Sequence, residues 1–149
     1  MSESVLEKIF GPEFVERYRK SLAKAQEIPR EKLSAIRSFA VEALKASEDF
    51  HVKYDNLDVI LVQTPRDLTK FPVVRTSAGN WKVGMIWPGS KSLRGPFISV
   101  FTALREDADK LASRPEKLWL LVGKLQERTF EGDVTYSFRC QGIIDLEEG

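Results

Sequence analysis

The last third of the chain alternates between apolar and polar residues on either side of one short turn. Reading outward from Glu131-Gly132, one face of this segment collects apolar side chains: Leu121, Leu125, Val134, Tyr136, Phe138 and Cys140. The other face collects polar ones: Lys124, Gln126, Arg128, Thr135, Ser137 and Arg139. A period of two predicts an antiparallel hairpin with one face on a core and one face in water. Any fold of this chain has to accommodate that hairpin.

The same register places two cations against each other. With the turn at Glu131-Gly132, Lys124 lies directly opposite Arg139. Like charges that face each other across strands are destabilising. Either both side chains splay apart into water, or an anion lies between them.

The first 49 residues have the period of helices. Pro12 starts an amphipathic helix that runs to about Glu27, and Pro29 ends it. A second helix is predicted from about Arg30 to Asp49. Their apolar faces are formed by Phe14, Tyr18, Leu22 and Ala25 in the first helix and by Leu33, Ile36, Ala40 and Leu44 in the second.

The middle of the chain has the composition of strands and turns. Leu57–Gln63 is short, aliphatic and β-branched, which predicts a buried strand. Pro72–Thr76 and Trp81–Trp87 form a predicted hairpin around the turn Ser77–Asn80. Phe97 to Phe101 suits either the start of a helix after Gly95-Pro96 or a strand, and the helical pattern is clearer from Thr102 to Ser113.

These elements define an α+β fold. We expect N-terminal helices packed on an antiparallel sheet of about five strands, with one inserted helix, forming a cleft. A chain of 149 residues can bury about two-thirds of its unfolded surface as one domain. We therefore expect a single domain over residues 1–149, helical over 1–49 and mostly sheet over 50–149.

The near-neutral net charge of +1 hides a basic middle segment. From Lys70 to Arg105 there are six basic residues and no Asp or Glu, whereas residues 1–69 carry 11 basic and 12 acidic residues. Residues 106–149 carry 6 basic and 10 acidic residues. A hairpin, a loop and the start of the next element share this exclusion of acids, which a common anionic ligand would explain.

The chain offers little for catalysis or metal binding. His51 is the only histidine and Cys140 the only cysteine, so no zinc cluster and no catalytic triad can be assembled from a local motif. The sequence therefore predicts no catalytic residue, metal or cofactor. It shows no secretory leader and no membrane span, so we expect a cytoplasmic protein without a membrane partner. Few Asn and many charged residues lean toward a thermophilic source.

Two tryptophans share one face of the predicted strand Trp81–Trp87, and Lys82 lies on the other face. Both rings could belong to the core, or at least one could line a cleft and stack on bases. Gly84 weakens a strand unless a ligand or another backbone comes close. With a four-residue loop, Arg75 would share the face of Lys82.

Cations next to aromatics and glycines on strands are typical of proteins that bind single strands without reading sequence. We therefore predict binding of single-stranded DNA, or RNA, with this set of contacts: Phe71, Arg75, Trp81, Lys82, Trp87, Lys91, Arg94, Phe97, Lys124 and Arg139. The alternatives are a protein–protein interaction module, or an enzyme acting on a phosphorylated or nucleotide ligand that uses "GSKSLRG" as its anion site.

The order of these parts resembles one family. N-terminal helices followed by "LDVILVQ", "FPVVRTSAGNWKVGMIWP", "LRGPFISVFTALR", "LWLLVGKL" and "YSFRCQGII" look like the archaeal ThermoDBP-type single-stranded DNA-binding proteins. The resemblance covers about Phe10 to Ile144 and implies a helix-and-sheet domain with an aromatic-lined cleft. The founding type carries a C-terminal leucine zipper, but no heptads follow Ile144 here. A homo-oligomer would have to use the surface of the domain itself.

Overall fold

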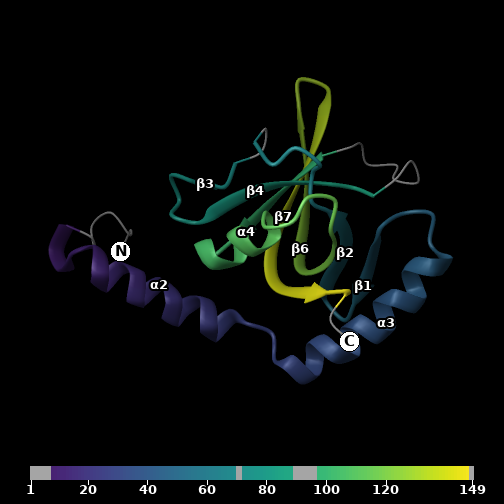
Figure 1. Cartoon of the computed structure of the whole chain (residues 1–149), viewed down its shortest axis with the longest axis horizontal. Helices are drawn as coiled ribbons and strands as arrows, with labels where there is room; N and C mark the ends of the chain where they lie inside the picture. Colours follow the sequence, from purple (N-terminus) through teal and green to yellow (C-terminus); the bar gives the residue numbers. More distant parts are fainter. Residues whose placement is uncertain (1–7, 70–71, 89–96, 148–149) are drawn as a thin grey trace.

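The computed structural model describes residues 8–69, 72–88 and 97–147 (Figure 1). Within these ranges, the fold comprises α2 Pro12–Gln26, α3 Arg30–Ala46, β1 His51–Tyr54, β2 Leu57–Gln63, β3 Val74–Arg75, β4 Trp81–Ile86, β5 Phe97–Thr102, α4 Arg105–Leu111, β6 Leu118–Phe130 and β7 Asp133–Asp145. The α+β class is confirmed: N-terminal helices precede a mostly antiparallel sheet with one inserted helix. The sheet has seven strands in the described ranges rather than about five.

The sheet curls into a ring. Its strand order is β1-β2-β6-β7-β5-β4-β3, and β2 also pairs with β4 through Gln63 and Ile86. All of these pairs are antiparallel except β5 with β7, which is parallel. The five strands that close the ring are β2, β4, β5, β6 and β7. Around the ring they follow the order β2-β6-β7-β5-β4, and β4 pairs back with β2. In the chain, α4 lies between β5 and β6. Closed five-stranded barrels with crossing connections of this kind include the OB-fold, a Greek-key barrel.

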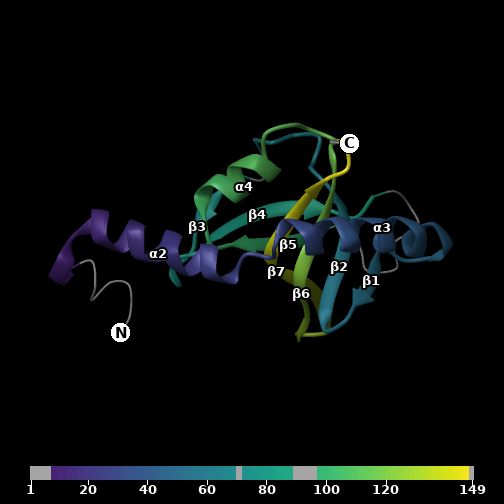
Figure 2. The same cartoon turned by 90° about the horizontal axis from the view of Figure 1, so that it is seen from below.

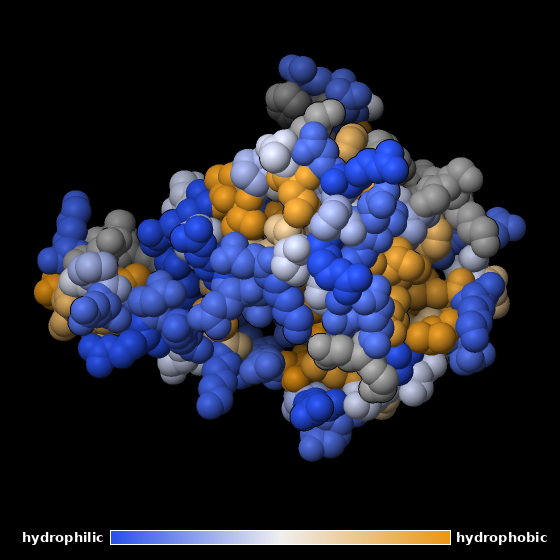
Figure 3. Space-filling view, viewed as in Figure 1, coloured by the Kyte–Doolittle hydropathy of each residue, from blue (hydrophilic) through white to orange (hydrophobic). Residues whose placement is uncertain are grey.

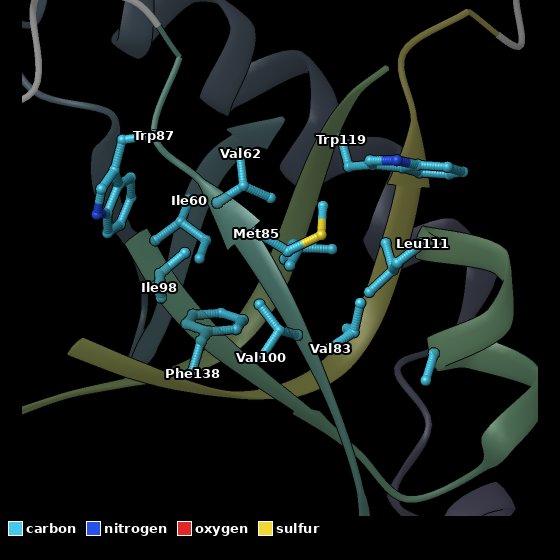
Figure 4. Close-up of a cluster of buried hydrophobic side chains, with 12 residues drawn as sticks. Ile60, Val62, Val83, Met85, Trp87, Ile98, Val100, Leu111, Trp119 and Phe138 are labelled. Carbon is cyan, nitrogen blue, oxygen red and sulfur yellow. The ribbon is translucent and has the colours of Figure 1, made fainter. Parts of the chain in front are cut away.

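The main core fills the barrel (Figure 4). Alternate residues of every ring strand point inward, because side chains on a strand alternate between its two faces. Helix α4 adds Ala108 and Leu111 to the same cluster. The inward side chains that are buried include Ile60, Val62, Val83, Met85, Trp87, Ile98, Val100, Trp119, Leu121 and Phe138.

A second core lies outside the barrel, under α3. Ile36 and Ala40 of this helix are fully buried in a cluster with Val59 of β2 and Leu120 and Val122 of β6. Residues 119–123 of β6 are therefore buried on both faces. Helix α3 thus covers one part of the outer surface of the barrel. It does not cover the part formed by β4, β5 and the halves of β6 and β7 that lie next to their shared turn, which we call the distal halves.

The long hairpin of β6 and β7 forms as predicted. Glu131 and Gly132 have positive φ values of 50° and 85°, as a tight turn requires. A register shift follows Val122, and a Cβ atom on Gly123 would lie only 1.8 Å from the Arg139 carbonyl oxygen. Glycine at this position therefore allows the two backbones to approach closely at the bulge.

The structure decides one segment that the sequence left open and adds one strand that it did not predict. Phe97–Thr102 is a strand and not the first turn of a helix, because Ile98 and Val100 point into the barrel and the strand pairs with both β4 and β7. The sequence-based prediction omits the short strand β1, because its four residues are too few for a period of two to stand out. Helix α4 begins only at Arg105.

Helix α2 extends away from the barrel in both cartoon views (Figures 1 and 2). It ends at Gln26, and a short link through Pro29 leads to α3. In the part of the chain that the structure describes, no helix is both long enough and apolar enough to cross a membrane.

Removing the Trp87 side chain should destabilise the fold. The residue is only 3% exposed and packs in the barrel core, so Trp87→Ala leaves a large cavity and should cost about 3–5 kcal/mol of unfolding free energy. Urea titration followed by circular dichroism measures this cost. A variant as stable as the parent would show that the ring is not part of the core.

Candidate nucleic-acid interface

The part of the barrel that α3 does not cover presents rows of outward side chains that the strand pairings bring side by side. In the first row, Lys82 of β4 pairs with Phe101 of β5, Phe101 with Arg139 of β7, and Arg139 with Lys124 of β6. Directly paired residues have Cβ atoms about 4.5–5.5 Å apart. Three cations and an aromatic ring thus form one line across four strands.

The next row is made of small or uncharged residues. Gly84, Ser99, Ser137 and Gln126 follow one another across the same four strands. Beyond them, Phe97 pairs with Ile86, and Arg128 pairs with Thr135. Three residues of the middle row, Ser99, Ser137 and Gln126, line a hollow beside Phe101. We call the surface formed by these three rows the outer groove.

A hollow of about 500 Å³ lies over this surface, between the β3–β4 turn and the β6–β7 hairpin. Its lining includes Ser99 and Ser137 of the middle row, together with Phe101, Arg128 and Arg139. The hollow thus combines a barrel face with an adjoining turn.

The cations of the outer groove differ in the contacts that their side chains make. Within the described ranges, the side chains of Lys82, Arg128 and Arg139 form no ion pair, and Lys82 and Arg139 are exposed. The Lys124 ammonium group instead donates to the Asn56 carbonyl in the β1–β2 turn. The predicted pairing of Lys124 with Arg139 is confirmed, and this hydrogen bond holds Lys124 toward the neighbouring turn.

The predicted position of Arg75 is wrong. Arg75 pairs with Trp81, and Val74 pairs with Lys82. The loop has five residues instead of four, because the Thr76 amide donates to the Asn80 carbonyl at 2.9 Å and closes a wider turn. A shift of one residue moves a side chain to the opposite face of the sheet, so Arg75 does not share the face of Lys82.

The two tryptophans face the barrel interior. Trp87 is buried, so it cannot stack on a base, and its ring meets that of Tyr136 edge-on at 6.4 Å. Tyr136 lines the hollow, so Trp87 packs behind a residue of the hollow's wall. Trp81 is half-buried against the core, and the guanidinium group of Arg105 lies 5.3 Å from its ring centroid. Period two correctly placed both rings on one face, and that face is the core.

Among the other predicted contacts, Lys82 and Arg139 flank Phe101 in the first row of the outer groove, and Phe97, which is 54% exposed, lies in the third row. Three predicted contacts, Phe71, Lys91 and Arg94, lie outside the described residues. The "GSKSLRG" loop lies outside them too.

The predicted contact set lacks Phe101 and Arg128. The helical pattern groups Phe101 with Leu104 and Ala108, because their spacing suits a period of 3.6. The hairpin pattern places Arg128 on the wet face, and its pairing with Thr135 confirms that position. Its place beside Phe101 in the hollow depends on the parallel pairing of β5 and β7, which no local pattern reveals.

Asp58 ties the β1–β2 hairpin to β6, next to Lys124. Its Oδ1 lies 2.8 Å from His51 Nε2, and its Oδ2 accepts a hydrogen bond of 2.9 Å from the Leu125 amide. Burial acts to raise the pKa of this carboxyl group, but the Leu125 N–H, His51 and Lys53 outweigh it and lower the pKa below its usual value. His51 therefore serves a structural contact outside the outer groove.

A second hollow of about 350 Å³ lies between α2, α4 and β7. Burial, then Glu27 and Glu106, raise the pKa of Asp107 at its wall. Burial also raises the pKa of the Cys140 thiol to about 12. Because the thiolate is the nucleophilic form of cysteine, this raised pKa gives no support to Cys140 as a nucleophile.

Comparisons with known proteins find likenesses only among solved structures, and these include a distant one. No protein-family model and no curated protein matches the chain. Among solved structures, it is similar to the wild-type single-stranded DNA-binding protein from Thermus aquaticus, with a TM-score of 0.42 and 17% sequence identity. The match covers 62% of this chain and 41% of that one. The chain thus matches less than half of that protein, and a likeness this distant carries no argument about function.

Replacing the Asp58 carboxylate should change how stability depends on pH. A pKa below its ordinary value near 3.8 means that the ionised group stabilises the fold above that pH. This contribution is lost as the pH falls through the folded-state pKa. Asp58→Asn should therefore lower the unfolding free energy at about pH 7 and flatten its decline toward about pH 3. Chemical denaturation at both pH values checks this; identical pH profiles for the two proteins would contradict it.

Proposed function

We propose that this barrel binds single-stranded nucleic acid, DNA or RNA, along the outer groove without reading sequence, and that it does so without catalysis. The observation that carries the proposal is the line Lys82, Phe101 and Arg139 across three paired strands. An aromatic ring sits between two cations there, and neither cation has an ion-pair partner in the described part of the chain.

The groove offers both parts of a single-strand site. Lys82, Arg128 and Arg139 would contact phosphates, which supply most of the sequence-independent affinity. Phe97, whose side chain is largely exposed, would stack on a base, and Phe101 in the lining of the hollow would support a second one. Stacking is worth about 1–3 kcal/mol per base and tolerates any base, because every base has a flat face.

The small middle row favours a single strand over a duplex. Ser99 and Ser137 form a low floor between the aromatic side chains, so flat bases can lie against the sheet itself. A duplex hides the faces of its bases and is usually read by a helix placed in a groove. The exposed cations of the outer groove lie on strands, and this supports the single strand as ligand.

The resemblance to the archaeal ThermoDBP-type proteins belongs to the same proposal. It is supported by the helices that precede the sheet and by the aromatic-lined groove on it. The rings of the described groove are Phe97 and Phe101 in place of the two tryptophans. An archaeal, thermophilic source and a cytoplasmic location remain predictions from the sequence.

Affinity for a labelled oligo-dT should depend on salt and on named groove residues. Neutralising three phosphates gives a slope of roughly −2 for log K against log salt. Lys82→Gln should make this slope shallower by about 0.7. Phe97→Ala should weaken binding by about 1–3 kcal/mol with little change in slope. Fluorescence anisotropy is the suitable readout, because the tryptophans that a quenching assay needs are buried or half-buried.

The matched control is Lys45→Gln, which removes an exposed cation that pairs with Glu42 on α3. This variant should bind like the parent. Parallel titrations with single-stranded RNA and with duplex test the ligand class. Affinity that ignores salt, or equal losses in Lys82→Gln and Lys45→Gln, would refute the outer groove as the site.

A further inference from the structure

We propose that the chain forms a two-fold symmetric dimer through α2, with the second copy as the occupant of an exposed stripe on this helix. Phe10, in the helical turn before α2, and Phe14, Tyr18 and Leu22 of α2 recur every four residues. Phe10, Tyr18 and Leu22 are 55%, 43% and 45% exposed. We call these four residues the α2 stripe.

The aromatic rings of the α2 stripe pack against one another. The Phe10 and Phe14 ring centroids lie 4.6 Å apart, and the Phe14 and Tyr18 rings are nearly parallel at 6.4 Å. The helix extends away from the barrel (Figures 1 and 2), and hydrophobic side chains show at the end where it begins (Figure 3). A contiguous apolar stripe of this kind on a soluble domain marks a contact surface.

The spacing of the stripe suits a second copy of the same helix. Residues four apart form one ridge on a helix, and two such ridges interlock when the helices cross at about −50°. If the crossing point lies between Phe14 and Tyr18, each of these rings meets the other one on the second copy. Phe10 precedes the helix, since Gly11 at the N-cap has a positive φ, and it extends the stripe through its ring contact with Phe14. One patch contacts itself, as a two-fold interface requires.

The charges of α2 select the antiparallel sense. Acids come first, with Glu13 and Glu16, and bases follow, with Arg17, Lys20 and Lys24. Glu13 and Arg17 form no ion pair within the described residues. In an antiparallel pair the acidic half of each helix faces the basic half of its partner, whereas a parallel pair would oppose like charges.

Sedimentation analysis over a wide range of protein concentration tests the dimer. The parent should shift from monomer to dimer as concentration rises. Tyr18→Ser combined with Leu22→Ser should raise the dimer dissociation constant by at least about tenfold. Phe97→Ser removes a similarly exposed aromatic residue from the outer groove and should leave the dissociation constant unchanged. Circular dichroism confirms that each variant is folded.

Charge reversal tests the antiparallel sense separately. Glu13→Arg and Arg17→Glu should each weaken the dimer, and the two changes together should restore it. A parent that stays monomeric at every concentration would overturn the proposal, and so would a dimer that ignores the stripe variants. A dimer that the stripe variants weaken but the double reversal does not restore would refute the antiparallel pairing.

Discussion

The closure of the barrel depends on β7, which lies between β6 and β5 and pairs with both. The pair with β6 is antiparallel and local, since only a two-residue turn separates the strands. The pair with β5 is parallel and joins residues almost forty positions apart in the sequence, such as Ser99 and Ser137. Without that second pair, Phe101 and Arg139 would not be neighbours, and the inward residues of β5 would lose the wall they pack against.

This constraint also divides the outer surface of the barrel. Helix α3 packs over β2 and the first half of β6, where Leu120 and Val122 are buried. The distal half of β6 extends beyond that cover and alternates Lys124, Gln126 and Arg128 outward. The groove therefore forms where α3 does not reach. If α2 pairs with a second copy, each dimer would carry two outer grooves. A nucleic-acid strand bound in both grooves would then have a higher overall affinity than one bound in a single groove, because its second contact is intramolecular.

The sequence predicted what local patterns determine. The turn at Glu131-Gly132 and the pairing of Lys124 with Arg139 follow from period two, and both are confirmed. The face of Arg75 could not be derived, because one extra loop residue inverts it. Helical and strand patterns both suited Phe97–Thr102, and only long-range pairing decided between them. Period two also could not tell whether the shared face of Trp81 and Trp87 was core or cleft.

The central claim is that a single strand lies on the outer groove. Chemical-shift mapping of backbone amides by heteronuclear NMR, with a short oligo-dT added stepwise, tests it most directly. The account predicts that the largest shifts cluster on β4, β5 and the distal half of the β6–β7 hairpin, around Phe101 and Arg139. Shifts centred on α2, α4 and the hollow at Asp107, or no shifts at low salt, would contradict it.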